Sequence, residues 1–242
     1  MPNKKVTRSG IGCVIVMILL VVAIYPALDS SPQTYHATAL KARGRNVWIA
    51  IVSANTERDL LGKPMLWPED LEIELGKPFD SAEVYFSHLM SDGESGTFEY
   101  DPMKRVVPGL NPEMLTGPGL KKATGSDFSS KANAWHVIST SENSPVDMPF
   151  LVSRNVKASE IFYSTETELA ALNNDWRNAT NNVLSANKKI KPFGDTLAVW
   201  VNRGGNVYDA RKRYLTRVRV VPIAQPEGEP ELRVLPSIGG YR

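Results

Sequence analysis

The chain has 242 residues, enough for one folded domain of ordinary size with an added segment, or for two small domains. Hydrophobic residues make up 42% and charged residues 22%, a composition typical of a globular protein. A single cysteine excludes an intrachain disulfide, Cys-rich zinc sites and Cys-ligated iron–sulfur clusters. The net charge is +2, but outside Lys4, Lys5 and Arg8 there are 25 basic and 26 acidic residues. A nearly neutral body of this kind predicts no nucleic-acid partner.

The N-terminus predicts a membrane anchor. Residues 1–10 form a basic leader, and Ile11–Leu28 is an apolar run of 18 residues without a charged or amide side chain. A helix of this length covers about 27 Å, close to the ~30 Å hydrocarbon core of a bilayer. The basic residues before the run favour a cytoplasmic N-terminus. We therefore expect a single-pass protein of the inner membrane with residues 29–242 in the periplasm or outside the cell.

Two other interpretations of the apolar run are weaker. A cleaved signal peptide has a shorter apolar core and a small-x-small exit site, which residues 23–28 (AIYPAL) do not offer. A lipoprotein signal places its apolar run before the cysteine, whereas here the run follows Cys13. An uncleaved or N-terminally trimmed anchor is favoured.

Residues 29–62 predict an amphipathic helix, the stem, which continues the membrane helix with a kink near Pro26 or Pro32. One apolar stripe is formed by Leu40, Val47, Ile51 and Ala54. Gly44 weakens the middle of the helix by up to ~1 kcal/mol relative to alanine, and Gly62 followed by Pro64 ends it. The polar residues expected opposite the stripe are Lys41, Arg43, Arg45, Asn46, Ser53, Glu57 and Arg58.

Residues 63–223 predict an exported α+β domain. Met65–Pro78 is expected to be a connection in which Trp67 and Pro68 are extended. A short helix follows, capped by Asp80 or Ser81, with Val84, Phe86 or Leu89 facing inward and Gly93 at its end. Residues 91–131 lack any sustained period and are expected to be irregular, with one helical turn around Pro112–Leu115.

Strand patterns dominate the second half of the chain. The expected strands are Ala134–Thr140, Phe150–Asn155, Thr196–Asn202, Asn206–Arg211 and Leu215–Val221. Gly204-Gly205 indicates a hairpin between the third and the fourth. The Pro-rich tail, residues 224–242, is expected to be extended and poorly packed. The predicted fold class is α+β: a long N-terminal helix, membrane-spanning and then amphipathic, packed on a C-terminal antiparallel sheet.

Several stretches carry a family resemblance. They are residues 37–60 (ATALKARGRNVWIAIVSANTERDL), 85–93 (YFSHLMSDG), 133–139 (NAWHVIS), 149–156 (PFLVSRNV) and 191–205 (KPFGDTLAVWVNRGG). Together with the basic start and the apolar helix, this chain resembles type IV pilin-like proteins, in particular type II secretion system pseudopilins. The resemblance implies a non-catalytic structural subunit of an envelope filament, whose partners are the membrane, other pilin-like subunits and the secretion machinery.

The resemblance also implies a processing site. In that family a prepilin peptidase cuts after a glycine that follows the basic leader, which here is Gly10, leaving Ile11 as the new N-terminus. The family has glutamate at position five of the mature chain, where this chain has Ile15. This chain therefore lacks the carboxylate that pairs with a neighbouring subunit's amino terminus. The apolar stems are expected to pack side by side through Val14, Met17, Leu20, Val21 and Ile24.

Residues that could carry catalysis form no convincing motif. His36, His88 and His136 are not paired at metal-binding spacing, so each is interpreted as structural. Ser185 and Lys188 match the S-x-x-K spacing of penicillin-binding proteins, but the accompanying S-D-N and K-T-G elements are missing. We therefore expect no enzyme.

Two polar clusters could each be a calcium site or a solvated polar loop, and the solvated loop is the favoured interpretation of both. The clusters consist of Asp92, Glu94, Glu99 and Asp101, and of Asn173, Asn174, Asp175 and Asn178. A basic cluster is interpreted as a charged sheet edge; it consists of Arg211, Lys212, Arg213, Arg217 and Arg219. The alternative to a filament subunit is a signal-anchored periplasmic binding module that does not polymerise and recognises its ligand through residues 91–131.

Overall fold

The computed structural model describes residues 7–91, 106–121, 131–158, 190–211 and 233–240, with side chains from residue 34 onward, except those of residues 210 and 211. The chain divides into two compact units, residues 1–38 and 39–242. The described elements are an α+β set of four helices and one antiparallel sheet of five strands. This confirms the expected fold class at that level.

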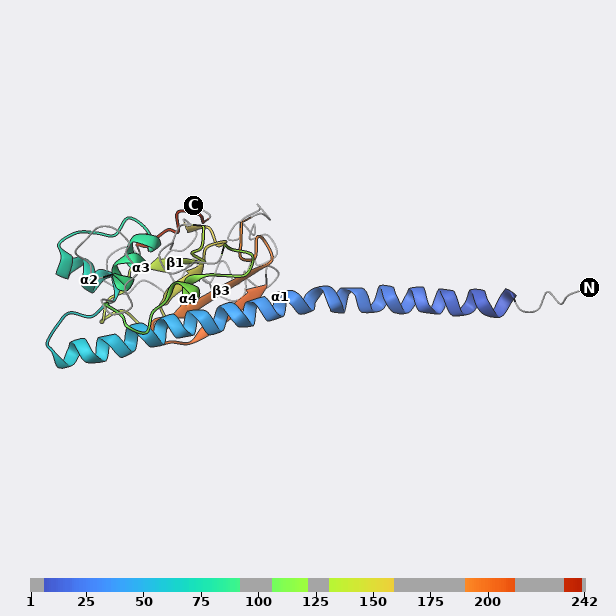
Figure 1. Ribbon diagram of the computed structural model, residues 1–242, viewed down its shortest axis with the longest axis horizontal. Helices are drawn as coiled ribbons and strands as arrows, with labels where there is room; N and C mark the ends of the chain where they lie inside the picture. The colour runs from blue at the N-terminus through green and yellow to red at the C-terminus, as the bar shows by residue number, and fades with distance from the viewer. Residues whose placement is uncertain (1–6, 92–105, 122–130, 159–189, 212–232, 241–242) are drawn as a thin grey trace, which may run out of the picture. The chain divides into compact units, whose positions relative to one another are not determined.

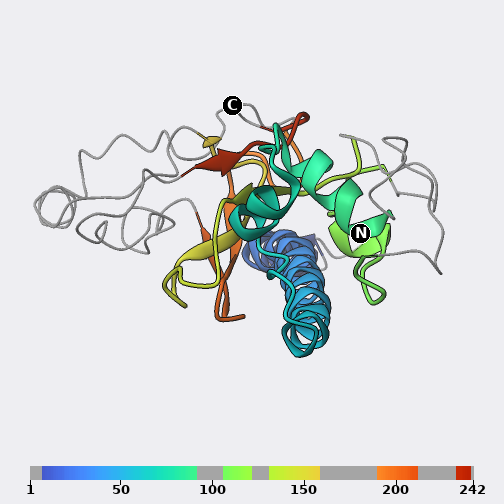
Figure 2. The ribbon, with the colours of Figure 1, turned by 90° about the vertical axis from the view of Figure 1, so that its left-hand side faces the viewer.

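The longest element is α1, Thr7–Leu60, of which residues 39–60 belong to the second unit. The predicted apolar stripe is confirmed: Leu40, Val47 and Ile51 are fully buried, and Ala54 is nearly so. In Figure 2 this part of α1 is seen nearly end-on, with the strands to one side of it. The helix ends as predicted, since Gly62 takes the left-handed conformation (φ +64°) and Lys63 N–H bonds back to Arg58 O.

Gly44 has a packing role in addition to its effect on helix propensity. It faces the sheet, and a β-carbon built there would lie 2.7 Å from Val201 Cγ2 and 2.9 Å from the Trp135 ring. Real β-carbons do not come this close, so the missing side chain is what lets α1 approach β1 and β3. Glycine at this position makes the central turn of the helix less stable, but it allows close contact between the helix and the sheet.

The connection after α1 contains a helix that the sequence prediction missed. α2, Pro68–Leu75, begins directly after Trp67, which is extended (φ −65°, ψ 150°), and it ends at Gly76. The prediction of extended chain is right for Trp67 and wrong for Pro68, because proline fits the first helical position, where no N–H is needed. Figure 1 shows α2 beside the C-terminal end of α1.

α3, Ala82–Met90, confirms the predicted short helix. Ser81 is its N-cap, with Oγ accepting from Val84 N–H at 3.4 Å. Phe86 and Leu89 are fully buried, whereas Val84 is about half exposed. The helix ends at Met90, and Gly93 lies outside the described residues. The predicted turn at Pro112–Leu115 is also confirmed as α4.

The first four of the five described strands follow the predicted positions to within one or two residues, and the fifth was not predicted. They are β1 Trp135–Ile138, β2 Pro149–Ser153, β3 Leu197–Asn202, β4 Val207–Arg211 and β5 Val234–Leu235, in the spatial order β4-β3-β2-β1-β5. All neighbours are antiparallel. The hairpin at Gly204-Gly205 joins β3 to β4 as expected. The strand predicted at Leu215–Val221 lies outside the described residues.

The C-terminal tail is better packed than predicted. Val234 and Leu235 form β5 against Ile138 and Val137 of β1. Leu235 and Ser237 are buried. The prediction of a poorly packed tail is therefore wrong for residues 233–240. Two residues of strand between prolines are too few to produce a pattern that a reader of the sequence can detect.

No helix within the described residues meets the length and hydropathy needed to cross a membrane. The predicted span, Ile11–Leu28, lies where the side chains are not described.

Candidate functional site

The face of α1 opposite the sheet carries an exposed stripe without charge. Its members follow one another at spacings of four and three residues, which place them on one side of a helix. We name this set the stem stripe; it consists of Ala42, Asn46, Ile49, Ser53, Thr56 and Leu60. Ile49 is 48% exposed and Leu60 83%. The stem stripe offers uncharged side chains for contact with a second helix, and the exposed charged residues of this part of α1 are Arg45, Glu57 and Asp59.

The prediction that the basic residues of the stem face solvent is wrong for Lys41 and Arg43. Lys41 bonds to Asp209 of β4. Arg43 Nη1 donates to Thr116 O at 2.8 Å and to Thr116 Oγ1 at 3.0 Å. Because Lys41 and Arg43 flank the buried stripe, their long side chains reach the globular domain, and the stem stripe between the flanks remains uncharged.

The rotation of α1 about its own axis is fixed by contacts with the β3–β4 turn. Trp48 Nε1 donates to Arg203 O at 2.6 Å. A β-carbon on Gly205 would lie 2.8 Å from the Trp48 ring, so the turn lies directly on the indole. Arg203 in turn stacks on Trp67, with Cζ 5.4 Å from the ring centroid. These contacts hold the stem stripe on the outward side of the helix.

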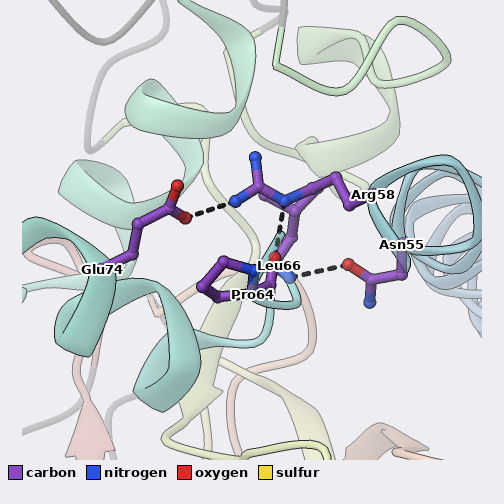
Figure 3. Close-up of polar contacts among 5 residues, drawn as sticks. All are labelled: Asn55, Arg58, Pro64, Leu66 and Glu74. Carbon is purple, nitrogen blue, oxygen red and sulfur yellow. Dashed lines mark hydrogen bonds and ion pairs between the residues drawn. The ribbon is translucent and has the colours of Figure 1, made fainter. Parts of the chain in front are cut away.

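A polar joint holds α2 against the end of α1 (Figure 3). Arg58 pairs with Glu74 of α2, and its Nε donates to Pro64 O at 2.6 Å. Asn55 Oδ1 accepts from the N–H of Leu66 at 2.6 Å in a buried position. Arg58 was expected on the outward polar face, and the structure places it in this joint instead.

A second feature is a buried polar cluster between α3, β1 and the C-terminal segment. Glu83, in the first turn of α3, accepts from Asn133 Nδ2 at 3.1 Å and from Ser237 Oγ at 2.7 Å. The backbone N–H of Ile238 also reaches its carboxylate, at 3.1 Å from Oε2. The imidazole of His136 accepts at Nδ1 from Ser237 N–H at 2.9 Å.

The surroundings of His136 determine its protonation state. Nε2 lies 2.9 Å from Val156 O and 3.1 Å from Arg154 O, so this nitrogen carries the hydrogen and Nδ1 is the acceptor. Complete burial lowers the pKa of His136 to about 4, and the positive charge of Arg154 acts in the same direction, against the bonds from the two carbonyls. At neutral pH the ring is uncharged.

Serine, histidine and glutamate occur together here, but not in the geometry of a nucleophile and its base. The Ser237 hydroxyl donates to Glu83, and the imidazole meets the backbone N–H of Ser237 instead of its hydroxyl. All three side chains are buried. The cluster therefore connects the C-terminal segment to α3 and β1, and His136 is a structural histidine, as predicted.

Most of the predicted site residues lie where the structure cannot be described in detail. Gly10 and Ile11 fall within α1, as do Val14, Met17, Leu20, Val21 and Ile24, but the side chains of all seven are not described. Both polar clusters proposed for calcium lie outside the described residues, as do Ser185 and Lys188. The basic cluster lies there too, apart from the backbone of Arg211 in β4.

Within the described ranges, no group of three or more His, Cys, Asp or Glu residues is arranged to hold a metal ion. His36 is exposed, and His88 is partly buried beside Phe79, with its pKa lowered mainly by burial. The sequence analysis missed Glu83 and Ser237. No local pattern marks them, since they are joined only by the fold.

Comparison of the chain with protein-family models, with curated proteins and with solved structures gives no match.

Proposed function

We propose that this chain is a pseudopilin-like, non-catalytic structural subunit of a type II secretion or type IV pilus-like envelope assembly. Residues 11–28 anchor it in the inner membrane, with the N-terminus in the cytoplasm and the exported domain on the other side. Copies of the chain, or other pilin-like subunits, pack against one another through their stems.

The observation that carries this proposal is the stem stripe. In an isolated domain, a helix packed on a sheet usually presents charged residues to water. Here the exposed positions Ala42, Asn46, Ile49, Ser53, Thr56 and Leu60 carry no charge, and Lys41, Arg43 and Arg58 reach back to the domain, so that Arg45, Glu57 and Asp59 are the charged residues that remain exposed on residues 39–60 of α1. An exposed helical face of this kind supports lateral contact with a second helix.

The order of elements supports the same proposal. A single helix, Thr7–Leu60, begins in the basic leader and ends on the domain, so the apolar run and the stem belong to one continuous element. An antiparallel sheet follows in sequence and packs on the stem through Gly44, with β1 and β3 at the contact. This is the arrangement that the family resemblance implies.

The test is the intact mass of the protein purified from its own membranes. We expect a mass that lacks residues 1–10 and includes one methyl group added to the new amino terminus at Ile11. A Gly10→Val variant is the matched control and is expected to keep its full length, because in the family that this chain resembles the peptidase cuts after a glycine. A full-length mass for the unmodified sequence contradicts the processing step and favours an anchored binding module that does not polymerise.

A further inference from the structure

The last described segment of the chain, residues 233–240, is joined to the domain by a short strand pairing and by side chains of the buried polar cluster. We name this segment the C-terminal strap. Its strand, β5, pairs with only two residues of β1, Val137 and Ile138, and Ser139 N–H adds one bond to Arg233 O at 2.8 Å. Two-residue pairing contributes little by itself, so the remaining contacts decide whether the strap stays closed.

Two of those remaining contacts lie elsewhere: Ala82 N–H donates to Pro236 O at 3.3 Å, and Arg233 pairs with Glu72 of α2. The others converge on His136 and Glu83. Ser237 N–H donates to His136 Nδ1 at 2.9 Å, and the Ser237 hydroxyl donates to Glu83 at 2.7 Å. Gly240 lies against the same imidazole, since a β-carbon there would lie 2.6 Å from His136 Cε1. The strap therefore depends on an imidazole that presents an unprotonated nitrogen.

Adding a proton to His136 breaks this arrangement for geometric reasons. Nε2 already donates to the carbonyls of Arg154 and Val156, so a second proton must go to Nδ1. There it would point at the N–H of Ser237, replacing a hydrogen bond by two opposed donors. The charged groups around the ring are Arg154, which follows β2 and opposes a second positive charge, and Glu83 of α3, whose carboxylate already accepts from Asn133, Ser237 and Ile238.

We propose that the C-terminal strap is an acid-released element: protonation of His136 detaches residues 233–240 and uncovers the outer edge of β1, while β1–β4 stay folded. This proposal does not depend on the role of the stem. It assigns to the strap a conformational switch that responds to pH, which is the pH outside the inner membrane if the domain lies where the proposed function places it.

The size of the effect follows from linkage. In the closed state the pKa of His136 is about 4, and in the released state it returns toward its ordinary value of 6.5. Because the pKa in the closed state is the lower one, closure is favoured above pH 6.5 and weakens as the pH falls toward 4. Between pH 7 and pH 4.5 the equilibrium constant for opening is expected to rise about fifty-fold.

Hydrogen exchange of the full-length chain in detergent tests this proposal. Exchange of a peptide covering the strap is compared with that of β2 at pH 7 and pH 4.5, after correction for the intrinsic pH dependence. We expect opening of the strap to rise by about fifty-fold while β2 keeps its protection. In a His136→Asn variant, which keeps an acceptor and does not titrate, the rise should be largely absent, although Glu83 is unchanged. An equal rise in both proteins, or equal loss in β2, overturns the proposal.

A second measurement covers the case in which His136→Asn does not fold. The imidazole of His136 in the unaltered protein is titrated by NMR alongside the exchange of the strap. Release of the strap must follow the protonation of this ring over the same pH range. If the ring takes up its proton while the strap keeps its protection, the proposal is wrong.

Discussion

Gly44 is the residue at which helix stability and packing conflict most directly. We predict that Gly44→Ala lowers the free energy of unfolding by about 1–2 kcal/mol, although alanine is the better helix former by up to ~1 kcal/mol. The added methyl group would overlap with Val201 and Trp135, both fully buried, and overpacking of this kind costs about 1–3 kcal/mol. Urea denaturation of the full chain in detergent measures the change.

Gly109 provides the matched control for this substitution. A β-carbon there would meet Ala50 Cβ at 3.4 Å, an ordinary contact. Gly109→Ala should therefore leave the free energy of unfolding within about 0.5 kcal/mol of the original. If Gly44→Ala changes the free energy of unfolding as little as Gly109→Ala does, α1 does not lie as close to the sheet at Gly44 as the structure indicates.

Glu83 is a buried carboxylate that stabilises the fold by accepting hydrogen bonds from buried donors. Replacing it by alanine leaves Ser237 Oγ, Ile238 N–H and Asn133 Nδ2 without this acceptor. We predict a loss of about 2–4 kcal/mol in the free energy of unfolding, since each unsatisfied buried donor costs about 1–3 kcal/mol. Glu83→Gln keeps one acceptor oxygen and should lose less. A Glu83→Ala variant as stable as the original protein would contradict the importance of the cluster.

At the scale of elements, we predict which of two residues in the joint between α1 and α2 contributes more to the free energy of unfolding. The number of polar contacts that each residue makes suggests the opposite order. Arg58 makes two polar contacts and Asn55 one. Nevertheless, Asn55→Ala should cost more, about 1–3 kcal/mol, because it leaves the buried Leu66 N–H without a partner. Arg58→Ala breaks a partly exposed ion pair of the kind that contributes about 0–1 kcal/mol, together with one bond to a carbonyl. Urea denaturation of both variants tests the order, and a larger loss for Arg58→Ala contradicts it.

How far each element could be predicted from the sequence depends on whether it repeats a pattern. The buried stripe of α1 covers four helical turns, so periodicity was enough to find it, and β3 is a run of six buried residues rich in β-branched and aromatic types, which composition and the bounding turns identified. α2 has only eight residues and begins with proline, which in sequence indicates extended chain as readily as a helix start. β5 has two residues, and only its pairing with β1 identifies it.

The candidate sites were less predictable than the fold, for a physical reason. His136, Glu83 and Ser237 come from three segments that meet only in the folded chain, and burial in that chain is the main cause that lowers the pKa of His136. The stem stripe was partly visible, since Asn46 and Ser53 were expected on the outward face. What the sequence does not show is that Lys41, Arg43 and Arg58 reach back to the domain.

At the scale of the whole molecule, we propose that the stem makes contacts on two faces. One face holds the sheet, and the other, the stem stripe, is available to a neighbouring subunit. A charge introduced in the middle of the stripe, as in Ile49→Glu, should therefore leave the stability of the exposed position within about 0.5 kcal/mol of the original. The same change should remove the protein from the sheared filament fraction in a sedimentation assay. Recovery of the variant in that fraction at the original level would contradict the role of the stripe.

The most direct test of the central claim is disulfide cross-linking between single cysteines in native membranes. With Cys13 replaced by serine, cysteine is introduced at Ile49 on the stem stripe or, as a matched control, at Val146, which is 63% exposed but belongs to the loop before β2. We predict that Ile49→Cys gives covalent dimers under mild oxidation, whereas Val146→Cys remains monomeric. Equal yields from both positions, or dimers from Val146→Cys alone, would contradict assembly through the stem.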